Sequence, residues 1–351
     1  MKELAKRIIN KIKPILIEKN EWYLHEFSDC TKFWNNFPFN LEIVNLGSSS
    51  AFYGFDYSNL PIKAANWAMR PQSFPQDFAL LKTYYSYLGP KAIVLIVLGP
   101  YSSCFKNYTD LSLEKYYTIL HPGVIEEFSL EKQKKIYNKK NKPWELYKIQ
   151  LFKGMIRNIK SIIRRRIRPE KYTYQPMNKI QLEEDAMQWI NGWKKQFNIT
   201  DMNAPLPIHI KEGREKRVST LKDIISFCKE RDLRPVIVLP PITQHLSSKM
   251  SETFRNNYIY SFLEEVNLCN TPFLNYLDDN RFQDEDFFNS FFLNKEGAKK
   301  FTKIVYDEIV KLSHDGVEFF DSHMLPVTKE LQEADWDMDA AEKGGYPHFM
   351  I

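Results

Sequence analysis

The sequence predicts an α/β protein of three layers (α/β/α), in which a parallel sheet of about five strands lies between helices and carries a basic helical insertion. Short apolar segments typical of buried strands alternate with segments of helical spacing. The clearest strand, residues 91–98 (KAIVLIVL), is apolar over most of its length, as expected for a central parallel strand covered on both faces. Strands that alternate with helices favour a parallel sheet with right-handed crossovers.

The elements follow one another in a regular order. Strands are expected over 42–46, 61–66, 91–98, 235–239 and 271–276. Helices are expected over 73–87, 219–231, 254–266 and 297–312. Residues 278–289, which are acidic and aromatic, are expected to form a loop before the closing helix.

The chain is long enough for a large core, with 351 residues of which 43% are hydrophobic. We expect an N-terminal helical segment over 1–40 and an α/β domain over 41–312. A mostly helical insertion at 104–215 interrupts that domain, and a tail follows over 313–351.

The composition is that of a cytoplasmic protein without a cofactor. The four cysteines are far apart in the sequence and contain no CxxC pair, so we expect reduced thiols and neither a disulfide frame nor a metal site. No apolar run reaches the roughly 18 residues of a membrane span, and the first residues lack the apolar core of a secretory signal. No glycine-rich loop that could cradle a phosphate is present.

Two basic amphipathic segments suggest contact with an anionic surface. Residues 2–19 alternate basic and apolar groups around Pro14, and either lie on a membrane or pack on the domain. Residues 132–171 hold fifteen Lys or Arg against Glu145 and Glu170, a local net charge of +13. Their central helix, 153–168, fits an anionic membrane surface, a polyanionic glycan or simply a solvated face. Nucleic acid is disfavoured because no known binding module frames the patch.

The first strand ends at a glycine that three serines follow, and this stretch is the candidate site. Ligands of open α/β sheets bind just past the carboxyl ends of the strands. A serine there is a nucleophile if a base activates it, and otherwise it belongs to a turn that caps a helix.

Three blocks of the sequence resemble the SGNH (GDSL-like) hydrolase superfamily. They are 45–49 (NLGSS), the strand and loop 235–241 (PVIVLPP) and 287–298 (FFNSFFLNKEGA). Within the superfamily, the chain is similar to the branch of the D-alanine-transfer protein of teichoic acid synthesis and related proteins of bacterial cell-surface polysaccharide clusters. The resemblance covers 40–100 and 217–312 and implies a flavodoxin-like sheet and an acylated glycan or other small acyl substrate.

The resemblance also implies site residues. It places the nucleophile at Ser49, with Ser48 where many members of the superfamily have aspartate. It implies oxyanion donors from the serine N–H, a glycine N–H and an asparagine side chain, and Gly47, Ser48, Asn66 and Ser102 lie in the matching regions. The sequence GPYS, which ends at Ser102, replaces the superfamily's Gly-x-Asn-Asp, so the amide donor of that block is missing.

The last block departs from the superfamily at the two positions that matter most for catalysis. Asn289 stands at the position of the aspartate and Phe292 at that of the histidine. A phenyl ring cannot take the proton of a serine, and loss of the base costs orders of magnitude in rate. His245, in the loop after a central strand, is either a replacement base or an ordinary surface histidine.

The tail carries a second resemblance. Residues 335–350 (DWDMDAAEKGGYPHFM) are similar to the segment that joins the glutaminase and isomerase halves of glucosamine-6-phosphate synthase. Since that enzyme's catalytic residues lie outside such a segment, we expect no aminotransferase activity from it.

Two functional hypotheses follow, besides the disfavoured one of nucleic-acid binding. One is a serine esterase or O-acyltransferase that acts through Ser49 on acyl groups of a surface glycan. The other is a non-catalytic binding or scaffold protein of envelope polysaccharide assembly, which uses the same crevice and the basic insertion for an anionic glycan or a membrane surface.

Overall fold

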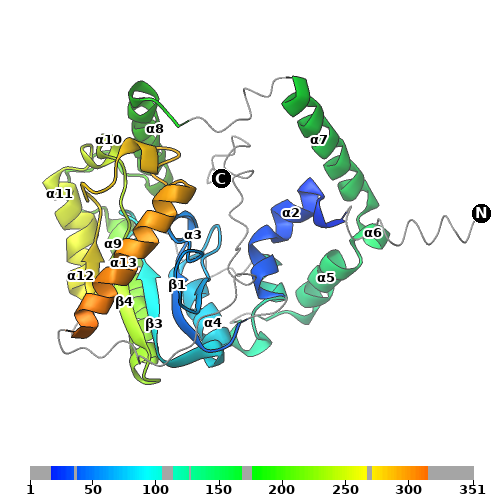
Figure 1. The fold of residues 1–351 in the computed structure, drawn as a ribbon, viewed down its shortest axis with the longest axis horizontal. Helices are drawn as coiled ribbons and strands as arrows, with labels where there is room; N and C mark the ends of the chain where they lie inside the picture. Colours follow the sequence, from blue (N-terminus) through cyan, green and yellow to red (C-terminus); the bar gives the residue numbers. More distant parts are fainter. Residues whose placement is uncertain are drawn as a thin grey trace, which may run out of the picture. The chain divides into compact units, whose positions relative to one another are not determined.

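The computed structural model describes residues 17–34, 38–104, 114–125, 128–167, 176–266 and 271–314. The chain forms two compact units, shown as ribbons in Figure 1. Residues 1–37 and 110–175 make up the helical unit, and residues 38–109 and 176–351 make up the sheet unit. Each is described by itself.

The sheet unit is built on five parallel strands in the order β2-β1-β3-β4-β5. The strands are β1 (Leu41–Leu46), β2 (Ala64–Asn66), β3 (Leu88–Val97), β4 (Arg234–Leu239) and β5 (Phe273–Asn275). In the register, Val44 of β1 pairs with Val94 of β3, and Val94 pairs with Pro235 of β4. This confirms the predicted five-stranded parallel sheet. The order reverses between β1 and β3, which is where a doubly wound sheet of this type binds ligands.

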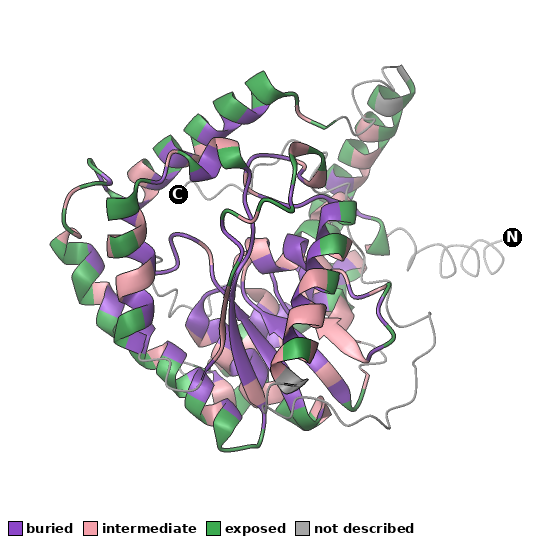
Figure 2. Ribbon diagram, turned by 60° about the vertical axis from the view of Figure 1, so that its left-hand side comes forward, coloured by how far each residue is buried: buried purple, intermediate pink, exposed green. Residues whose placement is uncertain are grey.

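Helices cover both faces of the sheet, which confirms the three-layer architecture. The helices are α3 (Ser49–Gly54), α4 (Phe74–Tyr84), α8 (Lys179–Phe197), α9 (Ile208–Lys229), α10 (Gln244–Ser247), α12 (Ser261–Val266) and α13 (Lys295–His314). α3 and α13 contact each other on one face, and α9 lies on β4 with α4 and α12 against it. Figure 2 shows that the central strands are mostly buried, whereas the edge strand β2 is of intermediate exposure.

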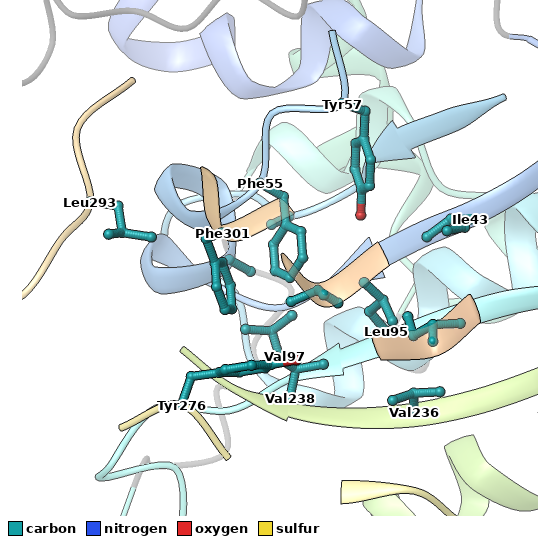
Figure 3. Close-up of a cluster of buried hydrophobic side chains, with 14 of the residues drawn as sticks. Ile43, Phe55, Tyr57, Leu95, Val97, Val236, Val238, Tyr276, Leu293 and Phe301 are labelled. Atoms are coloured by element: carbon teal, nitrogen blue, oxygen red, sulfur yellow. The ribbon is translucent and has the colours of Figure 1, made fainter. Parts of the chain in front are cut away.

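The core on the α13 face joins every central strand. Ile43, Leu95 and Val238 point from three strands into one cluster, which also contains the fully buried ring of Phe301 (Figure 3). The next residue of each strand points to the other face, because side chains alternate along a strand. Apolar burial on both faces explains why the strands read as continuous apolar runs.

The helical unit is organised around a close contact between two helices, α2 (Glu21–Phe27) and α7 (Lys148–Ile167). The Asn20 side chain donates to the Leu151 carbonyl over 2.8 Å, and the Glu21 N–H donates to the Asn158 side chain over 3.1 Å. A Cβ atom at Gly154 would lie 2.1 Å from the Asn20 oxygen, so only glycine permits this approach. Within the described residues, no helix is both long and apolar enough to cross a bilayer.

The expected insertion at 104–215 is divided between the two units. Residues 110–175 belong to the helical unit, whereas α8 and the start of α9 belong to the sheet unit. α9 begins eleven residues before the predicted helix at 219, because buried arginines hold its first turns instead of an apolar stripe. Arg214 donates to the Asn257 carbonyl over 3.0 Å and to the Ser261 hydroxyl over 2.8 Å.

The helix predicted over 254–266 is interrupted. It consists of α11 (Glu252–Arg255), a π-helical turn (Asn256–Tyr260) and α12. Apolar spacing at 3.6 residues per turn does not distinguish such a turn from an α-helix.

Some of the expectations lie outside the described residues. They are the helix over 2–16, the tail from residue 315 onward, and Cys269. The cysteines that are described, Cys30, Cys104 and Cys228, are buried free thiols.

We predict that Phe301→Ala lowers the free energy of unfolding by about 3–5 kcal/mol, because it removes a fully buried ring from the core. Urea unfolding followed by circular dichroism measures the change. The matched control is Phe39→Ala, since the Phe39 side chain is 64% exposed and its loss should cost less than about 1 kcal/mol. Equal costs for the two variants would contradict the central place of Phe301.

Candidate functional site

A small pocket lies at the carboxyl ends of the central strands, next to the point where the strand order reverses. Ser50 lines it from the segment after β1, Gly99 from the segment after β3, and Ile242 from the segment after β4. Phe291 and Phe292 of the last sequence block form another wall. The pocket is the place where the fold brings together the segments that sequence analysis singled out.

Gly47 makes the turn out of β1 and fixes the start of α3. Its φ is +129°, a conformation that residues with a Cβ atom rarely adopt. A Cβ atom there would lie 2.9 Å from that of Ala51 and 3.0 Å from the Val97 carbonyl oxygen. Glycine therefore lets the chain pass directly from β1 into α3, against the end of β3.

The hydroxyl of Ser49 is sealed inside the protein. Ser49 is 5% exposed, and its Oγ makes no hydrogen bond with any residue that the structure describes. The neighbouring Ser48 Oγ accepts a hydrogen bond from the Gln72 N–H over 3.2 Å. Activation of a serine requires a base within hydrogen-bond reach. In the described part of the chain, the predicted nucleophile has no such base.

Ser50, which follows the predicted nucleophile, is the serine that reaches the pocket. The segment after β3 forms a tight turn, in which the Gly99 N–H donates to the Ser102 Oγ over 2.8 Å. A Cβ atom at Gly99 would lie 3.8 Å from the Ser50 Oγ and 4.0 Å from the Ser102 Oγ. Ser50 therefore contributes a hydroxyl to the pocket lining, whereas the Ser102 hydroxyl lies next to Gly99 and accepts from its backbone.

Asn289 and Phe292 belong to a single turn. The Asn289 side-chain oxygen accepts from the N–H groups of Phe291, over 2.9 Å, and Phe292, over 2.7 Å. The side chain at the superfamily's aspartate position thus holds its own loop, as Asn does in many turns.

The Phe292 ring is packed among other aromatic rings. It is 3% exposed, and ring centroids lie 5.1 Å away at Tyr53, 5.5 Å at Trp189 and 4.7 Å at Phe291. Aromatic pairs at such distances stabilise a core beyond the area that they bury. Phe292, at the position that the resemblance assigns to a histidine, thus forms part of an apolar wall.

A buried carboxylate anchors the same loop from α8. Asp185, 2% exposed, accepts from the Ser290 N–H over 2.9 Å and also from the Ser290 hydroxyl. The Ser290 carbonyl accepts from the N–H of Thr243 over 3.1 Å and from its hydroxyl over 2.9 Å. The last block is therefore tied both to α8 and to the loop after β4.

His245 is held by carboxylates and not by the serine. Its Nδ1 lies 3.2 Å from an oxygen of Glu183, and its Nε2 lies 3.2 Å from an oxygen of Asp284. Lys249 also pairs with Glu183 and is the main reason why the pKa of that carboxyl is lowered. Since the Ser49 Oγ has no partner among the described residues, the structure does not join His245 to it.

Asn66, the candidate oxyanion donor, stabilises the end of α3. Its Nδ2 donates to the carbonyls of Phe52 and Phe55, both over 3.1 Å, and its Oδ1 accepts from Asn45 over 2.8 Å. Both the nitrogen and the oxygen of the amide therefore make hydrogen bonds within the fold, around the end of α3 and not in the pocket.

Asp77 is a buried acid that sequence analysis missed. It is 2% exposed and lies behind the serine stretch, where one carboxyl oxygen accepts from the Gly47 N–H over 2.8 Å and from the Gln72 side chain. Burial raises the pKa of Asp77 to about 7, against the hydrogen bonds, which lower it. Asp77 lies near the start of the helix expected over 73–87 and belongs to no catalytic or binding motif, so no sequence signal identifies it as part of the site.

The described residues contain no group of three or more His, Cys, Asp or Glu side chains that could hold a metal ion. The structure brings Gly47, Ser48 and Ser49 together with Gly99, Ser102 and Phe292 around one end of the sheet. Ser50 belongs to the predicted serine stretch but was given no role of its own, and Asp77 and Asp185 are residues of this region that sequence analysis did not predict.

We predict that Asp77→Asn changes the pH dependence of stability. Because the folded pKa is raised above the ordinary 3.8, the folded state binds the proton more tightly, and stability falls as pH rises from about 4 to about 7. Asp77→Asn has no carboxyl group to ionise, so it does not lose this stability as pH rises. Its amide oxygen can still accept from the Gly47 N–H and the Gln72 side chain. At pH 8 it should be more stable than the wild type, by on the order of 2–4 kcal/mol, and the gap should close below pH 4.

Urea unfolding at pH 4, 6 and 8 measures this difference. Asp223→Asn, which removes an exposed carboxylate from α9, controls for the loss of one charge. A constant offset between wild type and Asp77→Asn at all three pH values would contradict the buried acid's role.

Comparison with known proteins finds similarity over a short segment of the chain. No family model matches it. It is similar to the glutamine–fructose-6-phosphate aminotransferase (isomerizing) of Thermus thermophilus, with 48% identity over 44 residues, 12% of this chain and 7% of that protein. The corresponding enzyme of Caldanaerobacter subterraneus subsp. tengcongensis is 48% identical over 56 residues, 15% of this chain and 9% of that protein.

The same name is carried by a relative from Clostridium perfringens, which is 52% identical over 44 residues, again 12% of this chain and 7% of the relative. The chain thus spans less than a tenth of the length of these curated relatives. The matches agree with the resemblance of residues 335–350, which lie outside the described residues. The resemblance of the other three blocks to the SGNH superfamily finds no support in these comparisons.

Proposed function

We propose that the sheet unit is a non-catalytic binding or scaffold module of bacterial envelope polysaccharide assembly, built on an SGNH-like fold. The resemblance of three sequence blocks supports the superfamily and the envelope context. The three-layer fold and the gathering of those blocks at one end of the sheet support the same view.

The observation that carries the proposal is the replacement of the catalytic base by a packed phenyl ring. Phe292 is buried between aromatic neighbours and is held in place through the Asn289 turn. The Ser49 hydroxyl has no proton acceptor among the described residues. Without a base, a serine hydroxyl at neutral pH is a poor nucleophile.

The pocket suits recognition of a small group and not of a whole sugar chain. Apolar surfaces from Pro240, Ile242 and Phe291 form its walls, and Ser50 contributes a hydroxyl. Pockets of this type bind apolar groups and use a few polar atoms to orient them. An acyl substituent on a glycan has this chemistry, with an apolar part and an ester oxygen.

One observation favours the second candidate, a serine esterase or O-acyltransferase. Ser49 keeps the place of a nucleophile, directly after β1 and at the first residue of α3, with an uncommitted hydroxyl. Such an activity would need a base other than His245 in its present contacts, because both ring nitrogens of His245 face carboxylates.

We predict that a serine-directed fluorophosphonate does not label the folded protein, because no base activates Ser49. Gel fluorescence and intact-mass spectrometry measure the label, with an active serine hydrolase in the same tube as the positive control. Labelling that disappears in Ser49→Ala, but not in Ser50→Ala, would refute the non-catalytic proposal and support the esterase.

We predict that Gly99→Leu weakens binding of an acylated glycan by about tenfold or more, since the added side chain fills the pocket next to Ser50. The probe is an O-acetylated polysaccharide, compared with the same polymer after ester hydrolysis, in calorimetric titrations.

Gly192→Leu is the matched control, because a Cβ atom at Gly192 on α8 meets nothing within 4 Å. Equal affinity of the wild type for the two forms of the polymer would exclude recognition of the acyl group. Equal affinity of the two leucine variants for the acylated form would place binding elsewhere.

A further inference from the structure

α7 in the helical unit presents an exposed row of apolar side chains, here named the apolar stripe. It consists of Ile149, Phe152, Ile156, Ile159 and Ile163. Their exposed fractions run from 37% at Ile156 to 68% at Ile149, with Phe152 at 63%. The spacing of three and four residues places all five on one side of the helix. A stripe of this kind that faces water usually marks an interaction surface.

The apolar stripe is not the side of α7 that packs on the rest of the helical unit. α2 and the residues before it contact Leu151, Gly154 and Asn158 through the hydrogen bonds and close approach given above. These three residues repeat at the same spacing, but on another side of the helix. The helix is thus held by one face while the apolar stripe stays exposed.

A third face of α7 is basic. Lys153, Arg157, Lys160 and Arg164 are exposed and also repeat at intervals of three and four residues. Helical geometry puts this basic stripe about a quarter of a turn from the apolar stripe. The whole helix contains seven Lys or Arg and no Asp or Glu. Any partner must therefore offer both an apolar surface and negative charge, side by side.

We propose that α7 docks in the plane of an anionic lipid bilayer, with the apolar stripe below the headgroups and the basic stripe against lipid phosphates. An interfacial helix has this combination of an apolar face with bulky residues and a polar face rich in Lys and Arg. At 20 residues, α7 would lie along about 30 Å of the surface. The proposal concerns the helical unit and does not depend on the function proposed for the sheet unit.

A soluble polyanion fits these observations less well. Nucleic acid or an acidic glycan would pair with the basic stripe through phosphate or carboxylate groups. Neither would bury five large apolar side chains, which a bilayer does. The bilayer is the partner that uses both stripes at once.

The test is sedimentation of the full chain with lipid vesicles. One set contains phosphatidylcholine alone, and the other contains phosphatidylcholine with about one third phosphatidylglycerol, an anionic lipid. We expect the protein to sediment with the anionic vesicles and to remain in solution with the neutral ones. Failure to sediment with the anionic vesicles would overturn the proposal.

Two sets of variants separate the apolar from the basic contribution. Ile159→Asp with Ile163→Asp changes two of the five residues of the apolar stripe, and Arg157→Gln, Lys160→Gln and Arg164→Gln together change three of the four residues of the basic stripe. Each should weaken vesicle binding by about tenfold or more. All five side chains are exposed, so unfolding curves of these variants should match that of the wild type.

Matched controls carry the same changes on the sheet unit. Ile180→Asp and Ile208→Asp replace isoleucines that are 72% and 74% exposed, and Lys211→Gln, Lys216→Gln and Lys222→Gln remove three exposed charges of α9. We expect these variants to bind as the wild type does. Unchanged vesicle binding by the apolar variant, with equal binding of heparin or duplex DNA, would overturn the proposal in favour of a polyanion site.

Discussion

The arrangement around the candidate site depends on the backbone at Gly47. Its N–H donates to the buried carboxyl of Asp77, and its Cα lies against Ala51 and the carbonyl of Val97. This one residue connects the end of β1, the start of α3, the end of β3 and, through Asp77, helix α4. A side chain here would collide with Ala51 of α3 and Val97 of β3, so the close approach of the serine stretch to β3 depends on the absence of one carbon atom.

At the same end of the sheet, the residues that the SGNH resemblance singles out make structural contacts. Phe292, Asn289 and Asn66 stand where the SGNH resemblance would place a base, its orienting partner and an oxyanion donor, and each has local contacts instead. The ring packs, one amide oxygen holds a turn, and the other amide joins α3 to the end of β2. The polar groups have partners within the fold and do not point together at a reacting atom.

Much of the fold could be predicted from the sequence, because long apolar runs and regular spacing report burial directly. The strand 91–98 and the closing helix from 297 were found within a few residues of β3 and α13. The start of α9 was missed because buried arginines, such as Arg214, carry its packing. Within the site, Gly47 and Ser49 were found through a local motif. Asp77 and Asp185 act across distances in the sequence that no local pattern spans.

The strand order also determines when paired strands become available during synthesis of the chain. β3 ends at Val97, and its neighbour β4 begins only at Arg234, more than 130 residues later. At about 5–20 residues per second, a ribosome takes several seconds or more to supply that partner. Meanwhile all the contacts described within the helical unit lie between residues 17 and 167 and can form. During synthesis the chain therefore carries an apolar strand with one open edge at a time when the described contacts of the helical unit can already form. Unpaired strand edges tend to pair with wrong partners, which is one reason why chaperones exist.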